Sequence, residues 1–114
     1  MKIYQIVLSK SEVEAVNSGK SLPKHRAYME GMLRGEFEER NRDFYEHVAN
    51  YKGNDLEGCF HSMNTWDDDK VEVVGRCHSL SVGDICVLQN GTAFMVAPMG
   101  FNQINFEEGE NNAS

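Results

Sequence analysis

The chain has 114 residues, 40% hydrophobic and 10% aromatic, which argues against global disorder and suits one domain around one core. Its net charge of −7, from 18 acidic and 11 basic residues, argues against binding nucleic acid through phosphate neutralisation. No apolar run approaches the ~20 residues of a membrane span, and the N-terminus lacks the features of a signal peptide. Three cysteines at irregular spacing are a poor disulfide framework. We therefore expect a cytoplasmic protein without membrane contacts or direct nucleic-acid contacts.

The N-terminal residues predict a strand and a short helix. The run KIYQIVL, residues 2–8, has apolar side chains on both faces, as an interior strand does. Ser9 and Glu12 then have the spacing of a capping box. A short helix should therefore follow to about Asn17, with Gly19 as a left-handed stop.

A second helix is predicted from Pro23, which suits a first helical turn because its missing N–H costs nothing there. Two i,i+4 pairs would form its packed face: Tyr28 with Met32 and Met29 with Leu33. Gly31 and Gly35 should weaken this helix. The charged residues 36–43 could continue it or form a solvated loop.

The middle of the chain predicts a second strand and the clearest amphipathic helix. The run FYEHVANY, residues 44–51, is strand-like. Asn54 and Glu57 repeat the capping-box spacing. Apolar residues then recur at i, i+3, i+4 and i+7, namely Leu56, Cys59, Phe60 and Met63.

The C-terminal part predicts a short edge strand at residues 71–74 and a β-hairpin. The hairpin strands, residues 84–89 and 92–97, flank Asn90-Gly91, a pair that favours a two-residue type I′ turn. Pro98 cannot donate to a ladder and should end the pairing.

This order of elements predicts an α+β fold: a small, mostly antiparallel sheet with helices packed on one face and a C-terminal β-hairpin. Residues 1–106 should form a single domain, and residues 107–114 a polar, flexible tail. An exposed strand edge would also allow a homodimer.

Two groups of residues are of types that can bind metal ions, but their spacing in the sequence does not match known metal sites. Zinc sites commonly use paired cysteines two to four residues apart, a pattern that is missing from the set Cys59, His61, Cys77 and His78. The run Asp67, Asp68 and Asp69 lacks the spaced oxygen ligands of a calcium loop. We therefore expect no metal site and no cofactor, and we interpret residues 65–70 as a solvated acidic loop.

Catalytic residues are not assigned from the sequence. His47, His61 and His78 could each act as a general base near neutral pH. Cys77 beside His78 could be a nucleophile–base pair, but sequence neighbours rarely have that orientation. No recognised catalytic motif is present, so the question of an enzyme stays open and a non-enzymatic protein is favoured.

The segment SLSVGD, before the hairpin, has a local structural explanation. Ser79 and Ser81 compete for backbone groups in turns, Gly83 permits an unusual φ, and Asp84 can accept backbone N–H bonds. The alternative is an anion-binding nest of backbone amides.

The stretch HSLSVGDICVL followed by a turn, a strand and GFNQI, residues 78–104, resembles the YodL-like domain of mobile-element and small phage proteins. A weaker similarity to short phage proteins covers residues 44–64. Gly83 departs from the mobile-element form, which usually has Ser there, and Pro98-Met99 replaces more polar residues. The resemblance implies a small accessory protein without known catalytic residues. The residues that carry the resemblance, in a structural role, are Ser79, Ser81, Gly83, Asp84, Asn90, Gly91, Gly100 and Phe101.

These observations favour a small phage-type accessory protein that binds and modulates a host or phage protein with a basic surface. Its own acidic surface would make the contact, in the limit as a nucleic-acid mimic or inhibitor. The candidate contact residues are Trp66, Asp67, Asp68, Asp69, Glu36, Glu38 and Glu39. The alternatives are a nucleic-acid-associated module of the small β-barrel type and a small hydrolase or transferase that uses its histidines.

Overall fold

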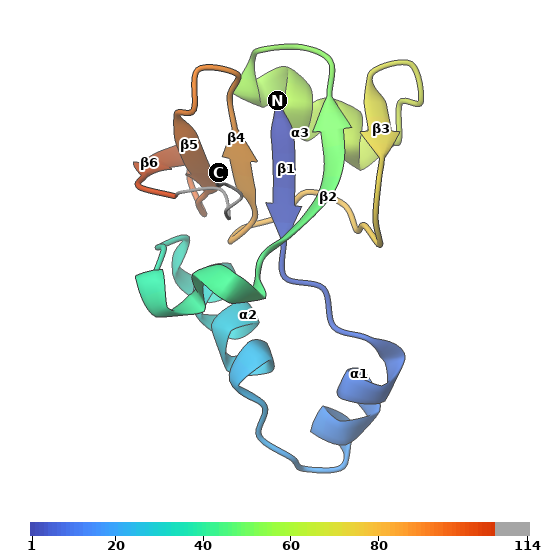
Figure 1. The fold of residues 1–114 in the computed structure, drawn as a ribbon, viewed down its shortest axis with the longest axis vertical. Helices are drawn as coiled ribbons and strands as arrows, with labels where there is room; N and C mark the ends of the chain where they lie inside the picture. The colour runs from blue at the N-terminus through green and yellow to red at the C-terminus, as the bar shows by residue number, and fades with distance from the viewer. Residues whose placement is uncertain (107–114) are drawn as a thin grey trace, which may run out of the picture.

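Figure 1 shows the computed structural model of the chain, which describes residues 1–106. The predicted tail, residues 107–114, lies outside the described residues. Six antiparallel strands form one sheet in the order β3-β2-β1-β4-β5-β6. The elements in chain order are β1 (Lys2–Gln5), α1 (Lys10–Asn17), α2 (Pro23–Arg34), the 3₁₀ helix η1 (Glu39–Phe44), β2 (Glu46–Tyr51), α3 (Leu56–Thr65), β3 (Val71–Val73), β4 (Ile85–Val87), β5 (Ala93–Val96) and β6 (Phe101–Ile104).

The α+β class is confirmed, and strands β4 and β5 are covered on both faces. Helix α3 lies against one face, whereas α1 and α2 lie beyond one end of the sheet as a helical arm (Figure 1). Cys59 and Met63 of α3 are fully buried in a cluster with Ile3 and Cys86. A second cluster of buried residues contains Ile85, Val87, Ala93, Met95 and Phe106. All three residues of β4 are therefore buried, as expected for a strand with apolar side chains on both faces.

The first helix has the predicted capping box. The Ser9 hydroxyl accepts from the Glu12 amide at 3.2 Å, and the Glu12 carboxylate accepts from the Ser9 amide at 2.7 Å. No residue of α1 is buried. Its stability therefore depends on local capping more than on packing.

The packed face of α2 differs from the prediction. Only Ala27 and Gly31 of this helix are buried, and Leu33 is 69% exposed. The reason is a close backbone approach: a Cβ on Gly31 would lie 3.4 Å from the Cα of Gly83. Gly35 does not weaken the helix but ends it, as a left-handed C-cap with φ of 66°.

Three local predictions are corrected by the structure. Asp55, not Asn54, caps α3, because its carboxylate accepts from the Gly58 amide at 2.9 Å. The charged segment 36–43 does not continue α2, because residues 39–44 form η1, and the predicted strand 44–51 begins only at Glu46. A further strand, β6, pairs with β5 after a reversal at Gly100, which has φ of 80°.

The β4–β5 turn is not type I′. That turn needs positive φ at both central residues, but Gly91 has φ of 90° and Asn90 does not have a positive φ. The Leu88 carbonyl accepts from the Gly91 amide at 2.9 Å, and the Leu88 amide donates to Thr92 O at 2.8 Å. These bonds define a tight turn followed by a glycine bulge.

Within residues 1–106, no helix combines the length and the apolar character needed to cross a membrane.

Candidate functional site

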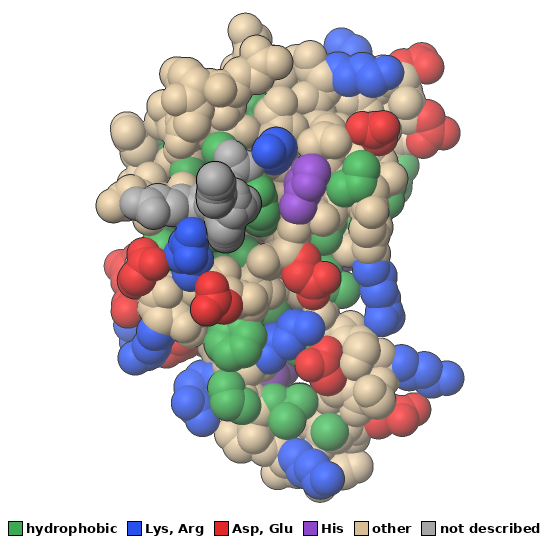
Figure 2. All heavy atoms as spheres, viewed as in Figure 1, with side chains coloured by type: hydrophobic (Ala, Val, Ile, Leu, Met, Phe, Trp, Pro, Cys, Tyr) green, Lys and Arg blue, Asp and Glu red, His purple; other side chains and the backbone are tan. Residues whose placement is uncertain are grey.

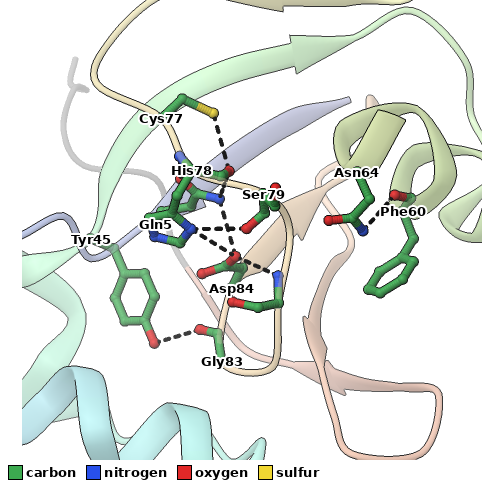
Figure 3. Close-up of polar contacts among 10 residues, drawn as sticks. Gln5, Tyr45, Phe60, Asn64, Cys77, His78, Ser79, Gly83 and Asp84 are labelled. Carbon is green, nitrogen blue, oxygen red and sulfur yellow. Dashed lines mark hydrogen bonds and ion pairs between the residues drawn. The ribbon is translucent and has the colours of Figure 1, made fainter. Parts of the chain in front are cut away.

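A buried polar cluster joins β1 to the turn that precedes β4 (Figure 3). Asp84 is 3% exposed, and its Oδ2 accepts from the Ser81 amide at 2.8 Å and from the Gln5 side-chain amide at 3.1 Å. Gln5, at the end of β1, is fully buried. Its side chain also donates to His78 O at 2.9 Å and accepts from the His78 amide at 3.1 Å. Gln5 therefore holds both the backbone of His78 and the carboxylate of Asp84.

Burial governs the charge of Asp84. Desolvation raises the pKa of this carboxyl to about 7, against the lowering effects of His78 and of the hydrogen bonds from Ser81 and Gln5. The ionised form is therefore costly in the folded protein despite its hydrogen-bond donors.

The His78 ring is oriented by its own loop. Its Nδ1 lies 2.9 Å from Ser79 O and 3.9 Å from the Asp84 carboxylate. Because a carbonyl oxygen only accepts, Nδ1 carries the hydrogen and Nε2 is the basic nitrogen of the neutral ring. This Nε2 is buried and has no hydrogen-bond partner among residues 1–106. The folded chain therefore leaves this nitrogen shielded from solvent and without a partner among the described residues.

His78 lines a cleft of about 370 Å³ between the sheet and the helical arm. We call it the His78 cleft; it is lined by Ile6, Val7, Leu8, Val13, Tyr28, Arg76, Cys77 and His78. The Tyr28 ring meets the His78 ring edge-on, with centroids 6.5 Å apart. A small number of polar groups on a largely apolar wall is typical of a small-molecule site.

Cys77 is not prepared for nucleophilic catalysis. Its thiol donates to His78 O at 3.5 Å rather than to a ring nitrogen. Burial, with a smaller effect of the Asp84 carboxylate, raises the pKa of this thiol. The thiol is therefore protonated near neutral pH, and the arrangement is suited to binding rather than to covalent catalysis.

The residues that carry the family resemblance are distributed over three turns. Ser79, Ser81, Gly83 and Asp84 form the turn of the polar cluster, where Gly83 has φ of 96° and its carbonyl accepts from the Tyr45 hydroxyl at 2.9 Å. Asn90 and Gly91 lie in the β4–β5 turn, Gly100 lies in the β5–β6 turn, and Phe101 begins β6. Only the first group belongs to the His78 site.

Sequence reasoning did not find Gln5. A polar residue within an otherwise apolar interior strand was the available signal, because a buried amide needs partners. Its partners Asp84 and His78 are 79 and 73 residues away in the chain, so they could not be named from local patterns.

The predicted contact residues Trp66–Asp69 lie at the β3 edge of the sheet. Trp66 ends α3 in a left-handed conformation with φ of 53° and is 44% exposed. It is the only residue other than glycine with positive φ within residues 1–106. The loop that follows is held by Asp67, whose carboxylate accepts from the Asp69 amide at 3.0 Å.

The other acidic candidates lie elsewhere. Glu36, Glu38 and Glu39 follow Gly35, whose carbonyl accepts from Asn102 of β6 at 3.2 Å. Since β3 and β6 are opposite edges of the sheet, the two acidic groups form two separate surfaces. Acidic and basic side chains are also interspersed on the face shown in Figure 2.

The three histidines considered as general bases occupy separate places. His47 bonds to Asn50 at 2.7 Å and packs against Tyr4, and His61 is exposed on α3. No hydrogen bond joins either of them to His78 within residues 1–106. The three histidines therefore belong to three different segments: β2, α3 and the loop before β4.

The metal-type residues are also dispersed. Cys59 is buried beside Cys86, and the hydrogen bond between their thiols, together with burial, raises the pKa of Cys86. Within the described part of the chain, no three His, Cys, Asp or Glu side chains lie close enough to hold a metal ion.

Comparisons with protein-family models, with curated proteins and with solved structures find no match to this chain. The resemblance to the YodL-like domain therefore stays a prediction from residues 78–104.

Proposed function

We propose that the chain is a non-enzymatic accessory protein that binds another protein with a basic surface through its β3 edge. The contact surface, which we call the Trp66 edge, comprises Trp66, Asp67–Asp69, Val73 and Val74. The observation that carries the proposal is the exposed tryptophan in a left-handed conformation at the end of α3, in a chain whose edge strand also has exposed valines. The predicted resemblance of residues 78–104 to phage and mobile-element proteins agrees with such an accessory role.

The conformation of Trp66 is not explained by helix capping alone. A left-handed backbone costs a non-glycine residue roughly 1–2 kcal/mol, and glycine would end the helix without that cost. Tryptophan is also among the residue types most enriched in binding hot spots. A role of the indole ring in binding accounts for its presence where glycine is the better cap.

The edge strand β3 and the residue after it also have exposed apolar side chains. Val73 and Val74 are 52% and 49% exposed. Strand β3 pairs only with β2 in the sheet, so its other side has no neighbouring strand among residues 1–106. A partner can therefore cover the valine side chains and the open strand edge together.

The charges at this edge favour a basic partner. Three acidic residues here are exposed: Asp68, Asp69 and Glu72. Two basic residues lie close to them, because the Lys52 amide donates a hydrogen bond to Lys70 O at 2.9 Å. Together with Asp67, the edge has four acidic and two basic side chains. This excess of negative charge would increase the association rate with a basic surface, more at low salt than at high salt.

The test compares proteins captured from a cell lysate by the immobilised chain and by matched variants. Trp66→Gly should keep its folding stability and bind its partner roughly 30-fold more weakly, as expected for a hot-spot residue. Asp68→Asn with Asp69→Asn should reduce binding mainly at low salt. The matched control, Glu36→Gln with Glu38→Gln, removes two charges from the other acidic surface and should leave binding unchanged. Equal capture by wild type and Trp66→Gly would refute the proposal.

A further inference from the structure

We propose that the His78 cleft binds a small apolar carboxylic acid, with the carboxyl group at Arg76 and the hydrocarbon part against the β1 exit and α1. This site is distinct from the Trp66 edge, and it does not depend on the function proposed above.

The apolar part of the cleft is a continuous wall. Ile6, Val7 and Leu8 follow β1 in sequence, and Val13 of α1, which is 41% exposed, faces the same space. The cleft volume of about 370 Å³ is at the lower end of the range for small-molecule sites. It suits a short hydrocarbon chain or a single ring, and burying these side chains would favour binding.

The polar part of the cleft lacks a partner for its cationic group. Arg76 is exposed and forms no ion pair within residues 1–106. His78 lines the same cleft, but its Nε2 is buried, so Arg76 is the charged group that a ligand in the cleft can reach. A carboxylate can accept two hydrogen bonds from the guanidinium of Arg76, which supplies the missing partner.

The charge of the whole protein does not prevent binding of an acid. The net charge is −7, but charges beyond about 8 Å are largely screened at physiological ionic strength. Two acidic residues flank Val13 on α1: Glu12, which pairs with Lys24 at 3.3 Å, and the exposed Glu14. Neither lines the cleft, whereas Arg76 does.

Binding should also tie the helical arm to the body of the protein. Helix α1 has no buried residue, and Val13 is its contribution to the cleft. Besides this contact, Lys24 links the arm to β2 through Glu46 at 3.7 Å. A ligand that covers Val13 would therefore protect residues 10–17 from hydrogen exchange.

Octanoate, below its micelle concentration, is the probe, and octanol is the uncharged comparison. In NMR titrations of the full chain, octanoate should shift the resonances of Val13, Tyr28, Cys77 and His78. The affinity for octanol should be lower than that for octanoate by a factor of roughly 10 or more. Arg76→Gln should weaken octanoate binding roughly 10-fold or more, whereas Arg26→Gln, an exposed arginine outside the cleft, should not.

A second variant tests the apolar wall and the arm. Val13→Asp changes an exposed position, so the fold should persist, yet octanoate should no longer protect residues 10–17 in hydrogen exchange. Three results would overturn the proposal: no shifts at the cleft, equal binding of octanoate and octanol, or octanoate binding that Arg76→Gln does not change.

Discussion

The buried carboxyl of Asp84 should make folding stability fall as the pH rises from 4 to 7. Its ordinary pKa is 3.8, and burial raises the pKa in the folded protein to about 7. Below pH 4 the carboxyl is protonated in both states, so it carries no penalty. Above pH 4 the unfolded chain ionises it while the folded protein keeps it neutral, and the penalty grows until about pH 7. A pKa difference of this size corresponds to about 4 kcal/mol.

Asp84→Asn isolates this effect. The amide has nearly the same shape and no titration, and the other carboxyls are common to both proteins. The free energy of unfolding, from urea titrations between pH 4 and pH 8, should fall by about 4 kcal/mol more in wild type than in Asp84→Asn. Asp68→Asn, at an exposed position, is the control and should follow wild type. A difference between wild type and Asp84→Asn that stays constant with pH would refute the reasoning.

Two further predictions concern the backbone and the helix cap. Gly83→Ala should lower the free energy of unfolding by several kcal/mol, because its Cβ would lie 2.7 Å from the backbone of Gly31; Gly91→Ala, with similar positive φ but nothing within 4 Å, should lose only about 1 kcal/mol. Equal losses in urea unfolding would show that the Gly31–Gly83 approach is not the cause. Ser9→Ala should destabilise α1 by about 1 kcal/mol through its lost cap. Because α1 buries no residue, hydrogen exchange of residues 10–17 should accelerate while Tm stays nearly unchanged; a large loss of Tm would contradict this.

The site was only partly predictable. Asp84 was expected to accept backbone N–H bonds, and it does so from Ser81. The sequence does not predict its low exposure or the desolvation that raises its pKa, because both depend on distant segments that pack around it, as α2 packs against Gly83. Likewise, Trp66 was singled out as the only tryptophan, but its left-handed conformation depends on where α3 ends.

The sequence by itself determined the features that depend on neighbouring residues. The α+β class, the capping box at Ser9, the interior position of β1 and the short edge strand β3 all follow from patterns within a few residues, where side-chain periodicity and local hydrogen bonds decide the structure. Only the tertiary structure decided the His78 cleft and the separation of the two acidic surfaces. Both depend on which distant segments meet: Gln5 contacts Asp84 across 79 residues, and the strand order places Trp66 and Glu36 at opposite edges. Contacts between distant segments result from packing of the whole chain, which no local sequence pattern encodes.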